Sequence, residues 1–289
     1  MKNSRMNKIK FVFTLAVTIS LIAPAVFAAE YEKSPQHDID IRVDAGIVYA
    51  PAFLGSKDYQ LSAVPNINLK YKDKFFASLQ DGIGYNVINN NGWRIGPIAK
   101  YIFCRSDDGD NPFRIAGNRT NALRGLGDVD GTLELGGFVE YTWKEWSVET
   151  ELRQGVNGHE GMVNDINATY TKDIHSIFYN DGPPLIISFG PHATLVNNNY
   201  NKTYFSITSH QSARSGLPRY TAGGGLLSYG FGTSVIVPLS ESISTTWTAG
   251  YDRLAGDAAD SPLVKQRGSE GQGTVGLFLS YSFGIDLMQ

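Results

Sequence analysis

Apolar and polar residues alternate along most of this chain, and the alternation has a period of two. In segment 38–50, every second residue from Ile39 to Tyr49 is apolar or small, and most residues between them are charged. The same pattern recurs in three further segments, 131–143, 242–255 and 272–283. A period of two is that of a β-strand with one apolar face. Beyond residue 28 no sustained stretch has apolar residues at helical spacing, so we expect an all-β fold.

The lengths of the alternating segments favour strands that cross a membrane. Most run for about 10 to 14 residues, which suits a tilted strand in a bilayer, whereas strands of soluble proteins average about 5 or 6. Twelve segments are expected to be strands: 38–50, 60–71, 74–88, 92–104, 131–143, 145–157, 162–174, 185–196, 201–209, 221–237, 242–255 and 272–283. The predicted fold is a transmembrane antiparallel β-barrel of about 12 strands, within a range of about 10 to 14, since bacterial barrels have even strand numbers.

The connections alternate in part between short and long, as expected for short periplasmic turns and longer outer loops. Short connections are expected at 72–74, 197–199 and 238–241, and long ones at 50–59, 175–184, 210–220 and 256–271. Counting the twelve predicted strands in order, however, places the longest connection, 105–130, on the periplasmic side and the tight turn 143–146 on the outer side. A turn or bulge at Asp81-Gly82, inside segment 74–88, would change which residues face the apolar side and would also change the end of the barrel at which each later connection lies.

Charged residues lie deep in the polar faces of the predicted strands, and aromatic residues lie near strand ends on the apolar faces. The candidates for the barrel lumen are Glu134, Glu140, Glu149, Glu151 and Arg153. The candidates for an interfacial aromatic girdle are Tyr141, Trp143, Trp146, Tyr251, Tyr281 and Phe283. Aromatic girdles of this kind mark membrane barrels. A β-sandwich also permits charges on its solvent face and remains the alternative, and Trp143 and Trp146 could instead be a docking spot for a periplasmic partner.

The N-terminus has the pattern of a secretory signal peptide, expected at residues 1–28 and followed by a single barrel domain at 29–289. A basic head precedes an apolar run that ends on the small residue Ala28. Removal of its four basic residues takes the net charge from −3 to −7, and an acidic chain without a basic cluster disfavours nucleic-acid binding. With Cys104 as the only cysteine, no intrachain disulfide is possible.

Several motifs, taken in order, resemble the MipA/OmpV family of outer-membrane proteins over about residues 40 to 283. They are Pro51 to Tyr59, Asp81 to Gly84, Gly125 to Asp130, Gly158 to Gly161 and Gln211 to Pro218. The resemblance implies an outer-membrane barrel in contact with the lipid bilayer and lipopolysaccharide, inserted by the barrel assembly machinery. It also implies a scaffold role, in which an MltA-interacting protein joins a lytic transglycosylase to a murein-synthesising penicillin-binding protein. The chain departs from the common barrel pattern in one respect, because a short tail follows the terminal aromatic residue Phe283.

Candidate catalytic and metal-binding groups are few. His210 and Ser212 are two residues apart, so an extended backbone would place them on one face, as base and nucleophile of an outer-membrane lipid hydrolase. An acidic loop holds the oxygen ligands that calcium prefers, at Asp107, Asp108, Asp110, Asn111, Asp128 and Asp130, without the spacing of an EF-hand. The five histidines are scattered, and no helix follows the glycines 223–225. No catalytic, cofactor-binding or metal-ligating residue is therefore predicted.

Three functions follow, in order of preference. The first is a non-enzymatic scaffold for peptidoglycan-remodelling enzymes. The second is a small pore or uptake channel for small solutes, whose selectivity would depend on charges such as Glu134 and Glu149. The third is a lipid hydrolase that would lose its activity on Ser212→Ala.

Overall fold

The computed structural model describes residues 37–287 with the exception of 110, 112, 118 and 175–183. The signal peptide expected at residues 1–28 lies outside the described residues and stays a prediction. Among the described residues, no helix has the length and apolar character needed to cross a membrane.

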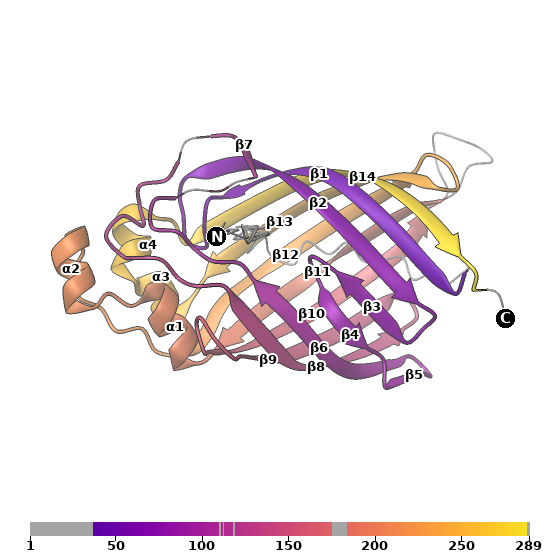
Figure 1. Cartoon of the computed structure of the whole chain (residues 1–289), viewed down its shortest axis with the longest axis horizontal. Helices are drawn as coiled ribbons and strands as arrows, with labels where there is room; N and C mark the ends of the chain where they lie inside the picture. The colour runs from indigo at the N-terminus through magenta and orange to yellow at the C-terminus, as the bar shows by residue number, and fades with distance from the viewer. Residues whose placement is uncertain (1–36, 110, 112, 118, 175–183, 288–289) are drawn as a thin grey trace, which may run out of the picture.

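Twelve antiparallel strands close into a barrel (Figure 1), as the sequence predicts. They are β1 (Ile39–Pro51), β2 (Tyr59–Tyr71), β3 (Phe75–Ser78), β4 (Gly82–Tyr85), β6 (Trp93–Ile102), β8 (Thr132–Trp143), β9 (Trp146–Gly155), β10 (Met162–Ile174), β11 (Leu185–Val196), β12 (Gly225–Pro238), β13 (Ile243–Leu254) and β14 (Gly271–Ile285). β1 pairs with both β2 and β14, which closes the wall. Two shorter strands add to it: β5 (Ile88–Asn90) pairs with β6, and β7 (Arg114–Ala116) pairs with β2.

Two of the predicted strands are wrong, and the errors cancel in the count. Segment 74–88 is not one strand but a hairpin, because β3 ends at Ser78 and β4 begins at Gly82, which has a φ of +86°. The turn proposed at Asp81-Gly82 is thereby confirmed. Segment 201–209 is not a strand, because Asn197 caps a helix there by accepting from the amide of Tyr200.

The two ends of the barrel differ in their connections. At the turn end, Ile39 pairs with both Tyr71 and Ile285, and the connections at 72–74, 144–145 and 239–242 are short. The loop end carries most of the long connections, including 103–131, and the four helices of the described residues (Figure 1). These are α1 (Asn198–Phe205), α2 (Ser209–Ser215), α3 (Gly256–Asp260) and α4 (Pro262–Arg267). Because short turns face the periplasm in outer-membrane barrels, the loop end is the outer one.

The structure tests the predicted length or side of four connections. The β3–β4 hairpin resets the count, so 105–130 lies at the loop end and 143–146 at the turn end. The short turn predicted at 197–199 is wrong, because the connection from β11 to β12 is long and contains α1 and α2. The connection predicted at 175–184 as a long outer loop joins β10 to β11 at the turn end, where Ile174 pairs with Leu185, so the predicted side is wrong. Residues 175–183 themselves lie outside the described residues.

The alternation in the sequence becomes an inside-out distribution of side chains. In β8, Leu133 and Leu135 are exposed on the outer surface, whereas Thr132 and Glu134 are buried in the interior. Lipid covers the outer surface of such a barrel, so the apolar side chains lie outside and the polar ones must pair with each other inside.

Candidate functional site

The barrel interior near the loop end holds an ionic cluster built on Arg153 of β9, called here the Arg153 network. The guanidinium donates to Glu134 of β8 at 2.8 Å, to Asp165 of β10 at 2.6 Å, and to Glu151 on its own strand. Lys100 of β6 reaches Glu151 at 2.6 Å. Four consecutive wall strands, β6 and β8 to β10, are thus joined across their inner faces. Since buried charges are costly unless paired, each carboxylate here depends on the two cations.

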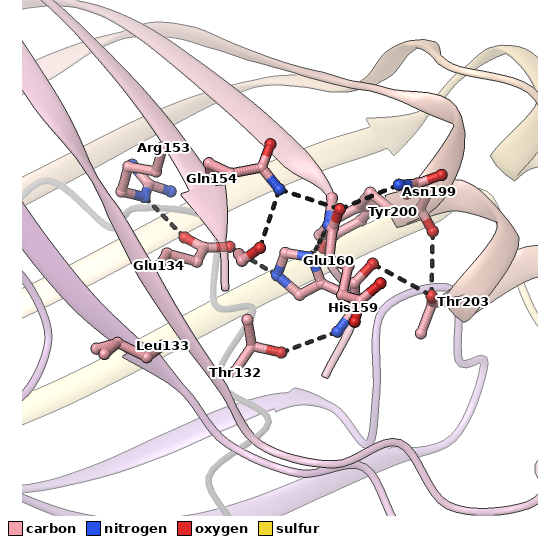
Figure 2. A network of polar contacts seen from close by, with 12 residues as sticks. Thr132, Leu133, Glu134, Arg153, Gln154, His159, Glu160, Asn199, Tyr200 and Thr203 are labelled. Atoms are coloured by element: carbon pink, nitrogen blue, oxygen red, sulfur yellow. Dashed lines mark hydrogen bonds and ion pairs between the residues drawn. The ribbon is translucent and has the colours of Figure 1, made fainter. Parts of the chain in front are cut away.

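His159 connects this network to the connection between β11 and β12 (Figure 2). Its Nδ1 accepts from the amide of Gly161 at 2.9 Å, so Nε2 carries the proton and donates to Glu134 at 2.9 Å. The imidazole ring is almost fully buried and lies edge-on to Tyr200 of α1, with ring centroids 5.0 Å apart. His159 therefore couples the ionic interior to the helical segment above it.

A second ionic group lies nearer the turn end. Arg94 of β6 donates from Nε to Glu140 at 2.7 Å, and Ser147 donates to the other oxygen of that carboxylate at 2.6 Å. The guanidinium stacks over Phe76 and Phe138, with its carbon 5.6 and 5.4 Å from their ring centroids. This group and the Arg153 network place paired charges at two levels of the interior.

The described residues of the connections 52–58, 103–131, 197–224 and 255–270 form one packed body at the loop end, called here the cap. Its apolar interior includes Phe205 of α1 and Val264 of α4, both about 1% exposed. Inward-facing residues at the loop ends of four wall strands belong to the same cluster: Val163, Val196, Leu227 and Leu254. A second apolar cluster adjoins it, formed by Phe53, Ala122, Leu123, Leu126, Ile207, Leu217 and Leu263. The cap is therefore seated in the mouth of the barrel.

Hydrogen bonds tie the connections of the cap together. Arg267 at the end of α4 donates to the carbonyls of Ala122, Arg124 and Ser215, which belong to two other connections. Gly125 lies where those two connections cross: its φ is +88°, and a Cβ on it would lie 2.9 Å from the backbone of Ser215. Any larger residue would force the connections apart.

A buried cation and a buried phenol meet within the cap. Arg105 donates to the carbonyl of Tyr204 at 3.0 Å, and its guanidinium lies over the ring of the same tyrosine. Burial lowers the pKa of Arg105 to about 10 and raises the pKa of Tyr204 to about 12. Both shifts follow from the cost of placing a charge where water is excluded.

The family of the chain follows from its sequence match to a known family model. The model described as "MltA-interacting protein MipA" matches residues 43–283, which cover the cap and all of the barrel wall except the turn ends of β1 and β14. This chain belongs to the MipA family. Four of the five motifs that resemble the family lie at the loop end, in or beside the cap, and the fifth, Asp81 to Gly84, contains the β3–β4 turn.

Curated relatives place this MipA-family chain in the outer membrane. It is 24% identical over 274 residues to "Outer membrane protein OmpV" of Vibrio cholerae serotype O1, which covers 93% of this chain and 98% of the relative. It is 22% identical over 247 residues to "Putative outer membrane protein YiaT" of Escherichia coli O157:H7, over 85% of this chain and 92% of the relative. Among solved structures, the NanC porin covers 83% of this chain and 98% of its own, with 11% identity and a TM-score of 0.45. The protein is an outer-membrane β-barrel, surrounded by lipid and lipopolysaccharide.

The structure brings most of the lumen candidates of this MipA-family barrel together. Glu134, Glu151 and Arg153 are buried within the Arg153 network. Glu140 pairs with Arg94, and Glu149 lies 4.0 Å from the same guanidinium.

The girdle candidates all lie on the outer surface, where they are exposed. Tyr251 is near the loop end, opposite Gly273. The other five are near the turn end: Tyr141, Trp143, Trp146, Tyr281 and Phe283. Their role as a membrane girdle stays a prediction.

The hydrolase candidates do not share a face. His210 and Ser212 lie on α2 and not on an extended backbone. Side chains two residues apart in a helix point about 200° away from each other around the helix axis. Asp110 of the acidic loop lies outside the described residues, and among the described ones no three His, Cys, Asp or Glu side chains converge on a possible metal position.

Sequence reasoning missed several members of the interior clusters. Lys100, Arg94 and Asp165 were not among the candidates, although each stands at an inward-facing position of its strand. The parity of charged residues along each strand was the signal that could have found them. His159 had no such signal, because it lies in the connection between β9 and β10.

Proposed function

We propose that this chain is a non-enzymatic scaffold that binds a lytic transglycosylase and a murein-synthesising enzyme at the periplasmic end of its barrel. The observation that carries the proposal is the family match, whose description is that of an MltA-interacting protein. The rigid build of the barrel supports it, since a rigid body holds two partners in a fixed arrangement.

The interior argues for a rigid body. Ion pairs join β6, β8, β9 and β10 across the lumen side of the wall, and the cap fills the loop-end mouth with apolar side chains. A conducting pore needs a continuous water path, which a packed apolar layer opposes. A solute channel is thus the second candidate, favoured by the charged interior and opposed by the cap.

The binding surface proposed for the enzymes is the turn end. The turn 143–146 presents Trp143 and Trp146, which pair with each other across the hairpin and are 58% and 44% exposed. Exposed tryptophans are frequent anchors of protein interfaces. In the scaffold role this hairpin would serve as one contact for the partner.

Binding of refolded protein in lipid nanodiscs to a purified lytic transglycosylase tests the proposal. We expect saturable binding that weakens at least tenfold in the double variant Trp143→Ser, Trp146→Ser. The matched control, Phe231→Ser with Trp247→Ser, changes two exposed aromatic residues on the outer wall away from this hairpin and should bind as the native protein does. Absence of binding by the native protein would refute the scaffold role.

Planar-bilayer conductance separates the scaffold from the channel. The native protein is expected to insert without single-channel steps. Phe205→Asp, which places a charge in the apolar cluster of the cap, is expected to produce steps by loosening the mouth. Steady steps from the native protein would favour the channel over the scaffold.

A further inference from the structure

One side of the barrel wall is not continuously hydrogen-bonded. β2 pairs with β1 along its whole length, from Tyr59 to Tyr71. On its other side it pairs with β3 only from Asn68 to Tyr71, and with β7 only at Leu61 and Ser62. Residues 63–67 of β2 therefore have no strand partner on that side among the described residues, and the amide of Ala63 donates there to the carbonyl of Phe113, just before β7.

The facing strand is interrupted at the same place. β6 pairs with β8 from Trp93 to Ile102. On its other side it pairs with β5 and then with β4 only at Ile98 and Ala99. We call residues 63–67 and 100–102, with the β3–β4 hairpin below them, the wall interruption. Figure 1 shows β3 and β4 as short arrows between the long strands β2 and β6.

The interruption is built by the sequence of the hairpin. Ser78 and Asp81 close the turn, with the hydroxyl donating to the carboxylate at 2.9 Å. Gly82 follows with a φ of +86°, and a Cβ there would lie 2.3 Å from the carbonyl oxygen of Ala99. Only glycine allows the two backbones to lie this close, so the position at which the β3–β4 hairpin turns is fixed relative to Ala99 of β6.

The level and width of the interruption follow from strand geometry. Residues 67 and 63 pair with Val43 and Ile47, which are four and eight residues from the turn end of β1. With about 3.3 Å per residue and a tilt of about 40°, the interruption lies roughly 10 to 20 Å above that end, within an apolar band about 25 Å tall. At the hairpin, β2 and β6 are three strand spacings apart, or about 14 Å. The interruption thus faces lipid in the outer part of the membrane.

The two sides of the interruption differ in polarity. Its outer rim carries apolar side chains that are more than half exposed: Ile67, Leu79, Ile83 and Tyr101. Its inner side carries Asn66, which accepts from the amide of Leu79 and donates to Asp44, and Lys100, which belongs to the Arg153 network. At this depth the medium in contact with the apolar rim is the hydrocarbon of lipid chains.

Pro65 argues against a strand of another protein as the occupant. The amide of Ala63 donates to the carbonyl of Phe113, away from β1, so the nitrogen of Pro65, two residues on, points to the same side. A proline there removes a donor that an added strand would need, which is how exposed strand edges are blunted.

We propose that the wall interruption is a lateral lipid site, in which an acyl chain of the surrounding outer-leaflet lipid enters between β2 and β6 and reaches the apolar cluster of Val48, Ala50 and Val64 behind β2. The apolar rim receives the chain, and the blunted edge excludes a pairing strand. The site does not depend on the scaffold role, since it uses neither the turn end nor the cap.

Cysteine labelling from within the membrane tests the lipid site, with Cys104→Ser as background. Val64→Cys lies at the edge of the interruption, whereas Val48→Cys lies on β1, which is paired on both sides. The two valines pack in one cluster and are 2% and 5% exposed, so they are closely matched. We expect a hexadecyl maleimide dissolved in the vesicle bilayer to label Val64→Cys at least tenfold faster.

Equal rates at the two positions would overturn the proposal. Faster labelling of Val64→Cys by a charged, water-soluble maleimide than by the lipid reagent would also overturn it, because water and not lipid would then fill the interruption. A second pair, Asn66→Cys against Ser280→Cys of β14, repeats the comparison if either valine variant fails to show the heat-modifiable mobility of a folded barrel.

Discussion

Inside the barrel, Arg153 holds three carboxylates, whereas in the cap Phe205 and Val264 pack among other apolar side chains. Both regions exclude water, yet opposite chemistry stabilises them. The wall must present its apolar side chains to lipid, so its interior is left with the polar ones. The cap extends beyond the wall strands and forms an ordinary hydrophobic core. The comparison predicts that the interior is sensitive to loss of charge and the cap to loss of volume.

The largest effect is expected from Arg153→Met. This substitution leaves the carboxylates of Glu134, Glu151 and Asp165 buried side by side without their arginine partner, and Lys100 is the cation that remains nearby. Loss of one member of a buried ionic group costs about 3 to 5 kcal/mol, and three like charges place this variant at the upper end. The free energy of unfolding in urea, followed in lipid vesicles, measures the loss.

The matched control for that prediction is Arg253→Met. Arg253 pairs with Glu270 at 2.8 Å, but its side chain is 53% exposed, so water replaces the lost partner. No measurable change is expected. Similar losses in the two variants would mean that the interior pairs do not depend on burial.

The second prediction concerns volume in the cap. Phe205→Ala removes a ring that is 1% exposed, and such truncations cost about 3 to 5 kcal/mol. The loss should remain local, because the wall has its own hydrogen-bonded ladders. Protease added outside vesicles should cut the connections of the cap, while the heat-modifiable mobility of the barrel persists. Leu239→Ala, at an exposed turn position, should leave cleavage unchanged.

A third prediction uses alkaline pH to test the cap alone. Burial raises the pKa of Tyr204 to about 12, above its value of 10 in an unfolded chain. The neutral phenol therefore contributes stability that is complete below pH 10 and is lost as the pH rises from about 10 to 12, up to about 2 to 3 kcal/mol. The lowered pKa of Arg105 acts in the opposite direction over this range, because folded Arg105 loses its proton before the unfolded chain does. The expected result is therefore a difference: as the pH rises from about 10 to 12, the stability of the cap against protease should fall further, or rise less, in the native chain than in Tyr204→Phe. Tyr229→Phe, on the exposed outer wall, should behave as the native chain.

The sequence predicts the wall better than the cap, for a physical reason. A strand of ten or more residues repeats its period of two often enough to be recognised, so β1, β8, β13 and β14 were found near their observed bounds. The helices of the cap have five to eight residues, too few for a period of 3.6 to be distinguished from alternation. For that reason the sequence pattern predicts a strand over residues 201–209, where the structure has a helix.

Part of the interior could also be anticipated, but not its pairing. Charges at inward positions mark Glu134 and Arg153 as lumen candidates, since lipid excludes them from the other face. Which acid meets which base depends on strand register, and register depends on the hairpin turn at Asp81-Gly82. The position of His159 could not be predicted in this way, because it lies in a connection, where side chains do not alternate between an inner and an outer face.

The smallest effect is expected from Arg267→Lys. This substitution tests whether the cap depends on the positive charge of Arg267 or on the planar geometry of its guanidinium. Arg267 spans the carbonyls of Ala122, Arg124 and Ser215 with one planar fork. Lysine keeps the charge but not the fork, so about one to two hydrogen bonds are lost, at about 1 kcal/mol each. Pulse proteolysis of the cap at neutral pH measures the change. Arg253→Lys, whose partner is a single carboxylate, should show none. If Arg267→Lys also shows none, the packing of the apolar clusters alone joins the connections, and the cap differs from the interior even more sharply.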